Sequence, residues 1–227
     1  MAPTLFYNEI CEAVRGLVQG GVGLTATTSG SDTVTVGSNR LFTVGQTVVL
    51  TDTAGQSETH TVAALVGLTG VQLSAAVQAT FSPAQGAMLA LDPPALGAAS
   101  GGLKWIGQGQ PELMPQPPAT QLPCVIIAPG RMDQPPAAGT NCAWRQDYRI
   151  QVYYLDRPMP GSVSGLDLLT QADALFGLLS SDPYLGGAAW YAQVLAVEPD
   201  PLPVRQMRAA GAEVVGVMVE VLAERLS

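Results

Sequence analysis

Residues 144–154, Trp-Arg-Gln-Asp-Tyr-Arg-Ile-Gln-Val-Tyr-Tyr, alternate large apolar side chains with charged and polar ones. One set of alternate positions holds Trp144, Tyr148, Ile150, Val152 and Tyr154, with Gln146 as its polar exception. The other set holds Arg145, Asp147, Arg149, Gln151 and Tyr153. Because successive side chains of a β-strand point to opposite faces, this pattern predicts a half-buried strand. We expect it to run antiparallel to the strand predicted before it.

The segments around this stretch predict the order helix, strand, strand, helix, strand, strand. They are an amphipathic helix over 4–19, strands over 122–128 and 144–154, a helix from Ser164, and strands over 190–197 and 212–222. Two helices can cover one face of a sheet of this size. We therefore predict an α+β core: a four-stranded, mainly antiparallel sheet with two helices on one face.

The second predicted helix has clear end signals. Ser164 followed by Asp167 is a capping box, and Asp182-Pro183 ends the helix. Its apolar stripe comprises Leu169, Ala172, Phe176 and Leu179, widened by Leu175. Beyond the next strand, prolines at 199, 201 and 203 predict a break before the last strand.

Residues 24–95 differ from the rest in composition. Thr, Val, Ser, Ala and Gly dominate, and five or so short Thr/Val-rich runs are separated by turn signals. We predict an inserted all-β domain, a small barrel or sandwich. The core is then discontinuous, comprising 1–23 and 96–227, and the Pro/Gly-rich residues 93–121 form a linker.

Composition excludes several classes of protein. The chain has 227 residues, with ten Lys and Arg against 18 Asp and Glu, and a net charge of −8. It therefore has no surplus of cations for binding nucleic acid through phosphates. Apolar residues make up 47% of the chain, which is enough to form a core. The sequence contains no run of 18 apolar residues, the length needed to span a bilayer as a helix.

The sequence predicts no catalytic, cofactor or metal site. The spacings of Cys11, Cys124 and Cys142 match no zinc or redox motif, and His60 is the only histidine. Glu198 and Asp200 flank a proline, which is typical of a solvated turn. Because an enzyme of this length usually shows a cluster of titratable residues, we predict that the protein is not an enzyme.

Arg145 and Arg149 share one strand face, with Asp147 between them. Two interpretations stay open. The face can be solvated, with cross-strand ion pairs. Alternatively, it can be a subunit interface, where arginine is enriched and pairs with carboxylates of a neighbour.

The order of elements resembles that of tail terminator (tail completion or head-tail joining) proteins of long-tailed bacteriophages. The resemblance covers residues 4–19 and about 122–227. It depends on the strand 144–154, the helix opening Gly165-Leu166-Asp167-Leu168-Leu169, and the late strand 213–221, Glu-Val-Val-Gly-Val-Met-Val-Glu-Val. The insert is similar to small β modules of virion proteins, through residues 43–50 and 58–62.

The resemblance implies a virion structural protein, assembled in the host cytoplasm as a homo-oligomeric, typically hexameric, ring. The ring would cap the head-proximal end of the tail tube, stop its polymerisation and join it to neck or connector proteins. DNA would pass through the lumen without specific binding, which suits an acidic chain. The loop 129–142 is the candidate contact to a neighbouring ring. The candidate interface residues are Arg145, Asp147, Arg149, Arg131 and Asp133.

Two alternatives remain. A head-completion or neck connector protein is similar in size and acidic balance. From another class, the β domain could be a carbohydrate-binding or adhesion module. That role usually needs exposed aromatic rings, and the insert contains only Phe42 and Phe81.

Overall fold

The computed structural model describes residues 6–92, 96, 102–109, 119–133, 145–158 and 164–226. The chain divides into two compact units, each described by itself below. Unit 1 comprises Met1–Arg15 and Gly102–Ser227, and unit 2 comprises Gly16–Gly101. Among the described residues, no helix is both long and apolar enough to cross a membrane.

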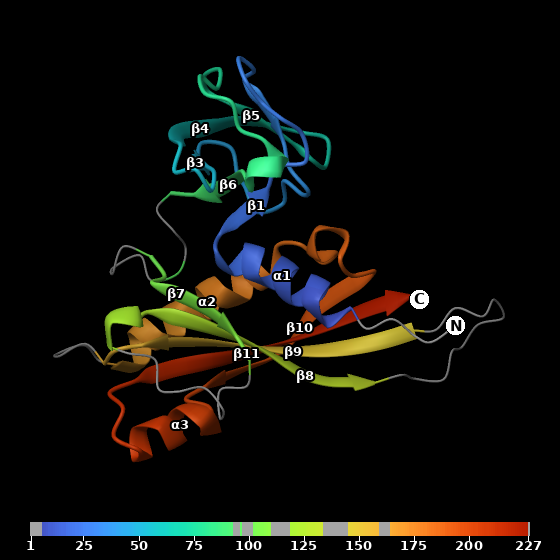
Figure 1. Cartoon of the computed structure of the whole chain (residues 1–227). Coiled ribbons are helices and arrows are strands. Elements are labelled where there is room, and N and C mark those ends of the chain that lie inside the picture. Colours follow the sequence, from blue (N-terminus) through green and yellow to red (C-terminus); the bar gives the residue numbers. More distant parts are fainter. Residues whose placement is uncertain are drawn as a thin grey trace. The chain divides into compact units, whose positions relative to one another are not determined.

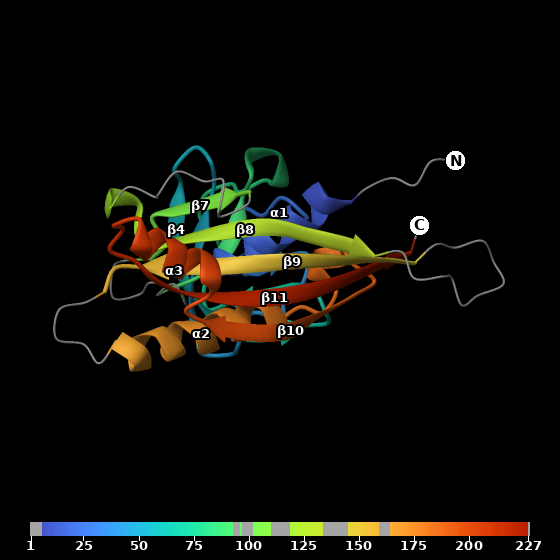
Figure 2. The same cartoon turned by 90° about the horizontal axis from the view of Figure 1, so that it is seen from below.

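Unit 1 is built on a five-stranded sheet (Figures 1 and 2). Its strands are β7 (Trp105–Gln108), β8 (Cys124–Asp133), β9 (Arg145–Asp156), β10 (Tyr191–Pro199) and β11 (Val215–Leu226). They lie in the order β10-β11-β9-β8-β7, and every pair is antiparallel except β7 with β8. The helices are α1 (Tyr7–Val18), α2 (Ser164–Ser180) and α3 (Leu202–Ala209).

The predicted α+β class is confirmed, but the predicted four-stranded sheet is wrong. The extra strand, β7, lies within the segment interpreted as a linker. The third helix, α3, begins where prolines were expected to interrupt the chain. β8 also continues to Asp133, so residues 129–133 are strand rather than loop. The rest of the predicted loop, 134–142, lies outside the described residues.

The first face of the sheet is apolar except at Gln146, the polar exception of the predicted alternation, which is buried as well. The alternation predicted for β9 is confirmed: Tyr148, Ile150, Val152 and Tyr154 are all buried. β11 adds Val217, Val219 and Val221 to the same face, because each pairs with one of these residues. Helices α1 and α2 lie on this side of the sheet (Figure 1). Burying this surface is the main favourable term for the fold of unit 1.

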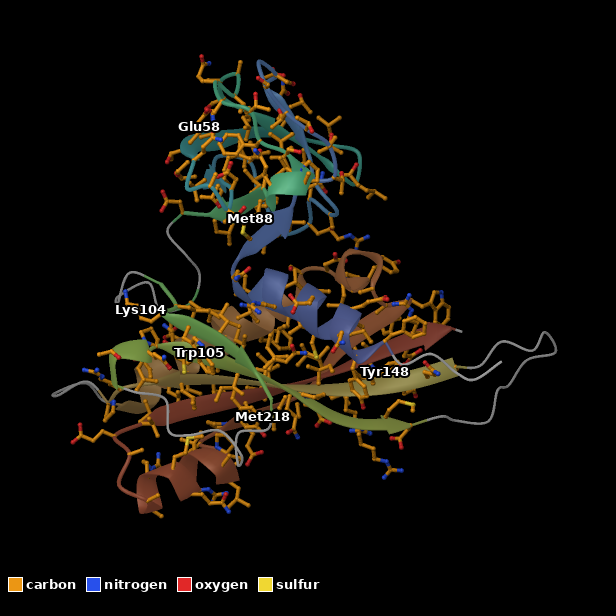
Figure 3. All side chains as sticks on the ribbon, viewed as in Figure 1. Glu58, Met88, Lys104, Trp105, Tyr148 and Met218 are labelled. Atoms are coloured by element: carbon orange, nitrogen blue, oxygen red, sulfur yellow. The ribbon has the colours of Figure 1, made fainter. Side chains whose placement is uncertain are left out.

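The second face is apolar only at one end, where α3 covers it. There Val204 and Met207 of α3 pack against a cluster that includes Cys124, Ile126 and Met218. Met218 points to this side of the sheet in Figure 3. Trp105 of β7 packs against the same cluster, so it anchors its strand to this core. The other end of this face carries charged side chains.

Helix α1 is fixed to the sheet by several contacts at its first turn. Tyr7 packs edge-on against Tyr148, with ring centroids 4.8 Å apart, and its hydroxyl donates to the carbonyl oxygen of Gly130 at 2.7 Å. The guanidinium of Arg225 lies 3.7 Å from the centroid of the Phe6 ring and pairs with Glu9. The first helix is therefore held to both β8 and β11.

Helix α2 corrects part of the predicted core. Ala172, Leu175 and Leu179 of the predicted stripe are buried, as expected. Leu169 and Phe176 are instead 52% and 46% exposed. Leu178, outside the predicted stripe, is only 3% exposed, so the buried face of the helix is turned toward Leu175 and Leu178 where α2 packs against β10 and β11. The side chains of the predicted capping box lie outside the described residues.

Unit 2 is a small all-β module of six strands in the order β1-β6-β3-β4-β5-β2. They are β1 (Gly21–Gly23), β2 (Thr33–Thr35), β3 (Thr47–Thr51), β4 (Ser57–Val66), β5 (Gly70–Leu73) and β6 (Met88–Leu91). The sequence did not indicate β1, which is three residues long. β1 pairs with β6, and the amide of Leu91 donates to the carbonyl oxygen of Gly20 at 2.8 Å. The module therefore begins and ends at one place.

Gly107 shows how tightly β7 is packed. A Cβ atom added at this position would lie 1.9 Å from the Trp105 ring, so only glycine fits beneath the indole. Gly177, within α2, has no heavy atom within 4 Å of the same added atom. The two glycines form a matched pair for testing this packing.

We predict that Gly107→Ala lowers the free energy of unfolding by about 1–3 kcal/mol, because the indole must leave its place on the core. Gly177→Ala should be neutral or stabilising by up to about 1 kcal/mol, since alanine favours helix. Urea unfolding monitored by circular dichroism measures both. Equal effects of the two substitutions would contradict the described packing of Trp105.

Candidate functional site

The predicted interface residues lie together on the second face of the unit 1 sheet, at the end that α3 leaves uncovered. Arg145, Asp147 and Arg149 come from β9, and Arg131 and Asp133 from the last residues of β8. Asp133 pairs with Asp147 in the strand register, which places the two segments side by side. The structure therefore brings all five residues together on one face. We call these five residues, with Glu220 and Glu224 of β11, the ion-pair ladder.

The ladder is held by contacts within the chain. Arg145 binds Asp147 on its own strand at 2.7 Å and Glu224 on β11 at 2.9 Å. Arg149 binds Glu220 at 3.0 Å and lies 3.9 Å from Asp133, which also pairs with Arg131. The cross-strand ion pairs expected for a solvated face are thus present. Hydrogen bonding to Asp147 raises the pKa of Arg145, and hydrogen bonding to Glu220 raises that of Arg149.

Carboxylates of the same chain thus pair with these arginines. The acidic partners are largely covered, with side chains 12% exposed at Glu224 and 19% at Glu220. The arginines are about two-fifths exposed, and Arg131 is 79% exposed. A neighbouring molecule would therefore meet the guanidinium groups first.

A second feature, the outer edge of β10, is not predicted by the sequence. Leu195, Ala196 and Val197 are consecutive and all exposed, so neither face of the strand is covered there. A β-bulge at Leu195 separates this part from the first half of the strand. In that first half, the Ala192 amide donates outward to the carbonyl oxygen of Pro183 at 2.6 Å. Among the described residues, no backbone group outside the sheet bonds to the rest of the edge, Leu195–Pro199.

Exposed apolar side chains gather on the same elements. Trp190 precedes β10 directly and is 58% exposed, and Tyr191 is 42% exposed. Leu169 and Phe176 belong to α2, which packs against β10. A free sheet edge rich in apolar side chains is a ready site for pairing with another chain.

The other candidates from the sequence remain separate. His60 lies on β4 of unit 2 with Glu58, which Figure 3 labels, and the His60 Nε2 atom is 3.2 Å from the Glu58 carboxylate. Asp200 binds Arg208 of α3 at 2.7 Å, and Glu198 is exposed on β10. Cys11 and Cys124 are buried free thiols, and burial raises the pKa of both; Cys142 lies outside the described residues. Within the described ranges, no three His, Cys, Asp or Glu residues form a group that could hold a metal ion.

Glu58 has a structural role in unit 2. Its carboxylate accepts hydrogen bonds from the backbone amides of Gln78, at 2.9 Å, and Ala79. Burial alone would raise the pKa of Glu58, but these hydrogen bonds and His60 outweigh that effect and lower it. The carboxylate thus ties β4 to the chain that follows β5.

We predict that Glu224→Gln lowers the free energy of unfolding by up to about 1 kcal/mol, because Arg145 loses an ionic partner. The loss should shrink in high salt, which screens the pair. Glu12→Gln is the control, since Glu12 is 63% exposed and lies 4.0 Å from Arg15. Urea unfolding at low and high salt measures the difference. A loss at Glu12 as large as that at Glu224 would show that the ladder adds no more stability than an exposed ion pair.

The lowered pKa of Glu58 predicts a pH dependence of unit 2. The ionised carboxylate stabilises the fold above the unfolded-state pKa of about 4.5. This contribution is lost as the pH falls through the lower folded-state value. The protection of the Gln78 and Ala79 amides, measured against their intrinsic exchange rate at each pH, should therefore fall in acid. Glu58→Gln should exchange quickly at neutral pH already; unchanged protection in that variant would contradict the assignment.

Comparison with known proteins adds no family to this description. No protein-family model matches the chain, and no curated protein sequence is significantly similar to it. The function therefore has to be inferred from the residues and geometry above.

Proposed function

We propose that the chain is a virion structural protein that forms a ring at the head-proximal end of a phage tail tube. The ring ends polymerisation of the tube and joins the tail to the neck. Its work is assembly by surface complementarity, without a chemical reaction.

The observation that carries this proposal is the open edge of β10. A protein that acts alone usually protects a sheet edge with charge, proline or a covering loop. Here Pro183 covers the first half at Ala192, and a β-bulge, Glu198 and Pro199 interrupt the second half, yet Leu195 and Val197 remain exposed there. In a ring of identical subunits, a neighbouring copy would cover such an edge.

Three further features support the same role. The core keeps the order α1, β8, β9, α2, β10, β11 on which the resemblance to tail terminators is based, with β7 and α3 added to it. The ion-pair ladder keeps an open sheet face polar. The net charge of −8 suits a ring through which DNA passes without being held.

The carbohydrate-binding alternative has less support. The only aromatic residues of the insert, Phe42 and Phe81, are 1% and 0% exposed. Sugar-binding sites stack their ligands on exposed rings, and both of these rings lie within the core of unit 2. The neck connector alternative shares the assembly role and is separated by experiment.

The proposal predicts a defined phenotype for a phage from which the gene for this chain has been deleted. Electron microscopy should then show overlong, headless tails beside filled heads, and the protein supplied in trans should restore joined particles. Tails of normal length beside unjoined heads would assign the protein to the neck instead. Normal, joined virions would contradict both roles.

A further inference from the structure

Most of the large apolar side chains that are exposed among the described residues belong to two groups, one in each unit. The first group lies on or next to α2 and β10 of unit 1. We call it the α2–β10 surface: Leu169, Phe176, Trp190, Leu195 and Val197. The second group lies at the turn between β4 and β5 of unit 2, and we call residues 65–69 the β4–β5 tip.

The α2–β10 surface lies along one margin of unit 1 (Figure 2). Leu169 and Phe176 are seven residues apart, so they lie on one stripe of α2. The helix packs against β10, and the Ala192 amide at the start of the strand bonds to Pro183 just beyond the helix. Helix and strand therefore run antiparallel, with Leu169 toward the end of the strand that holds Val197. Val197 pairs with Val219 of the apolar first face, so its side chain points to the side on which α2 lies.

The β4–β5 tip is apolar, exposed and held in one conformation. All five of its residues are exposed, and Leu68 is 71% exposed. Buried Asn39 holds the turn from behind: its side-chain amide donates to the carbonyl oxygens of Gly67, at 3.2 Å, and Gly70, at 2.8 Å. The backbone amide of Asn39 donates to the carbonyl oxygen of Leu68 at 3.0 Å. A turn that is fixed in advance loses little conformational entropy when it binds a partner.

The charges beside the two groups are of opposite sign. Asp173 is exposed on the same stripe of α2, four residues after Leu169 and three before Phe176. Arg40 is the only lysine or arginine of unit 2. It is exposed and directly follows Asn39, the residue that holds the tip. An acid on one apolar surface and a base beside the other favour one orientation of contact between them.

The two groups are also large enough for a specific contact. Their exposed apolar residues together amount to roughly 1,000 Å² of accessible surface, the lower limit for a specific protein interface.

We infer that the β4–β5 tip of one copy binds the α2–β10 surface of the next, and that Arg40 meets Asp173 across this contact. The inference rests on the proposed function in requiring copies of the chain to form a ring. The contact uses a different surface on each partner, so it is head-to-tail and can close into a ring. Leu195 and Val197, which are exposed at the edge of β10, are then covered by unit 2 of the neighbouring copy.

Substitution of the apolar residues tests the contact. Leu68→Ser and Phe176→Ser should each reduce the assembled fraction, measured by light scattering, at least tenfold. Leu202→Ser is the matched control, because Leu202 is 56% exposed but lies on α3, outside both surfaces. Circular dichroism should show that every variant is folded, since all three side chains are exposed. An equal loss of assembly in Leu202→Ser would overturn the assignment of the contact to these two surfaces.

Charge exchange tests the orientation. Arg40→Glu and Asp173→Arg should each weaken assembly at low salt, and the effect should shrink at high salt because salt screens the pair. The double variant should restore assembly, since the charges are exchanged rather than removed. Additive losses in the double variant would show that Arg40 and Asp173 do not meet.

Cysteine cross-linking identifies the partners. A chain with Leu68→Cys is mixed with a chain with Phe176→Cys, both carrying Cys142→Ser, and the mixture is oxidised. A disulfide should link the two kinds of chain, and neither kind should form linked dimers alone. Dimers of Leu68→Cys alone would indicate contact between two tips and would overturn the inference. A disulfide within one chain carrying both substitutions would do so too, because the tip would then bind its own unit 1.

The outcomes separate this inference from the proposed function. A ring that assembles normally in Leu68→Ser and Phe176→Ser and forms no cross-link would overturn the contact and leave the ring intact. A chain that is monomeric at all concentrations would contradict the contact and the ring together.

Discussion

The two-residue period of β9 is the constraint on which unit 1 depends. The strand is paired along its length with β11 and along most of it with β8, so its register fixes both neighbours. A shift of one residue would place Tyr148 and Ile150 among the charged groups and Arg149 beneath the helices. The apolar face under α1 and α2 and the ion-pair ladder on the other face are thus two sides of one pattern.

Much of the fold could be predicted from this pattern, because long segments with a clear hydrophobic period indicate their own secondary structure. The parts that were missed are short or carry mixed signals. β7 has four residues between glycines and prolines, and it is stabilised by pairing with β8 and by the packing of Trp105 on the core. The prolines at 199, 201 and 203 predict an interruption between two strands, where the structure has α3. Pro203 lies in the first turn of the helix, where a missing amide hydrogen costs nothing.

The candidate site was predictable only in part. The alternation placed Arg145, Asp147 and Arg149 on one face, which the structure confirms. Their partners Glu220 and Glu224 could not be assigned, since they depend on the register between β9 and β11, which is tertiary information. The open edge of β10 gave no signal either. An apolar residue in a strand predicts burial whether its own chain or another covers it, so exposure at Leu195 is visible only in the structure.

The closed ends of unit 2 have a consequence for how such a chain can evolve. β1 and β6 are paired, and Gly20 and Leu91 are joined by a hydrogen bond, so the module enters and leaves the chain at nearly one point. A module whose two ends are adjacent can be inserted into a short gap in another domain. The host could therefore acquire, lose or exchange the module in one genetic step while its own sheet is kept. The sequence of the module would then be free to change with the molecules that the module contacts, independently of the fold of the core.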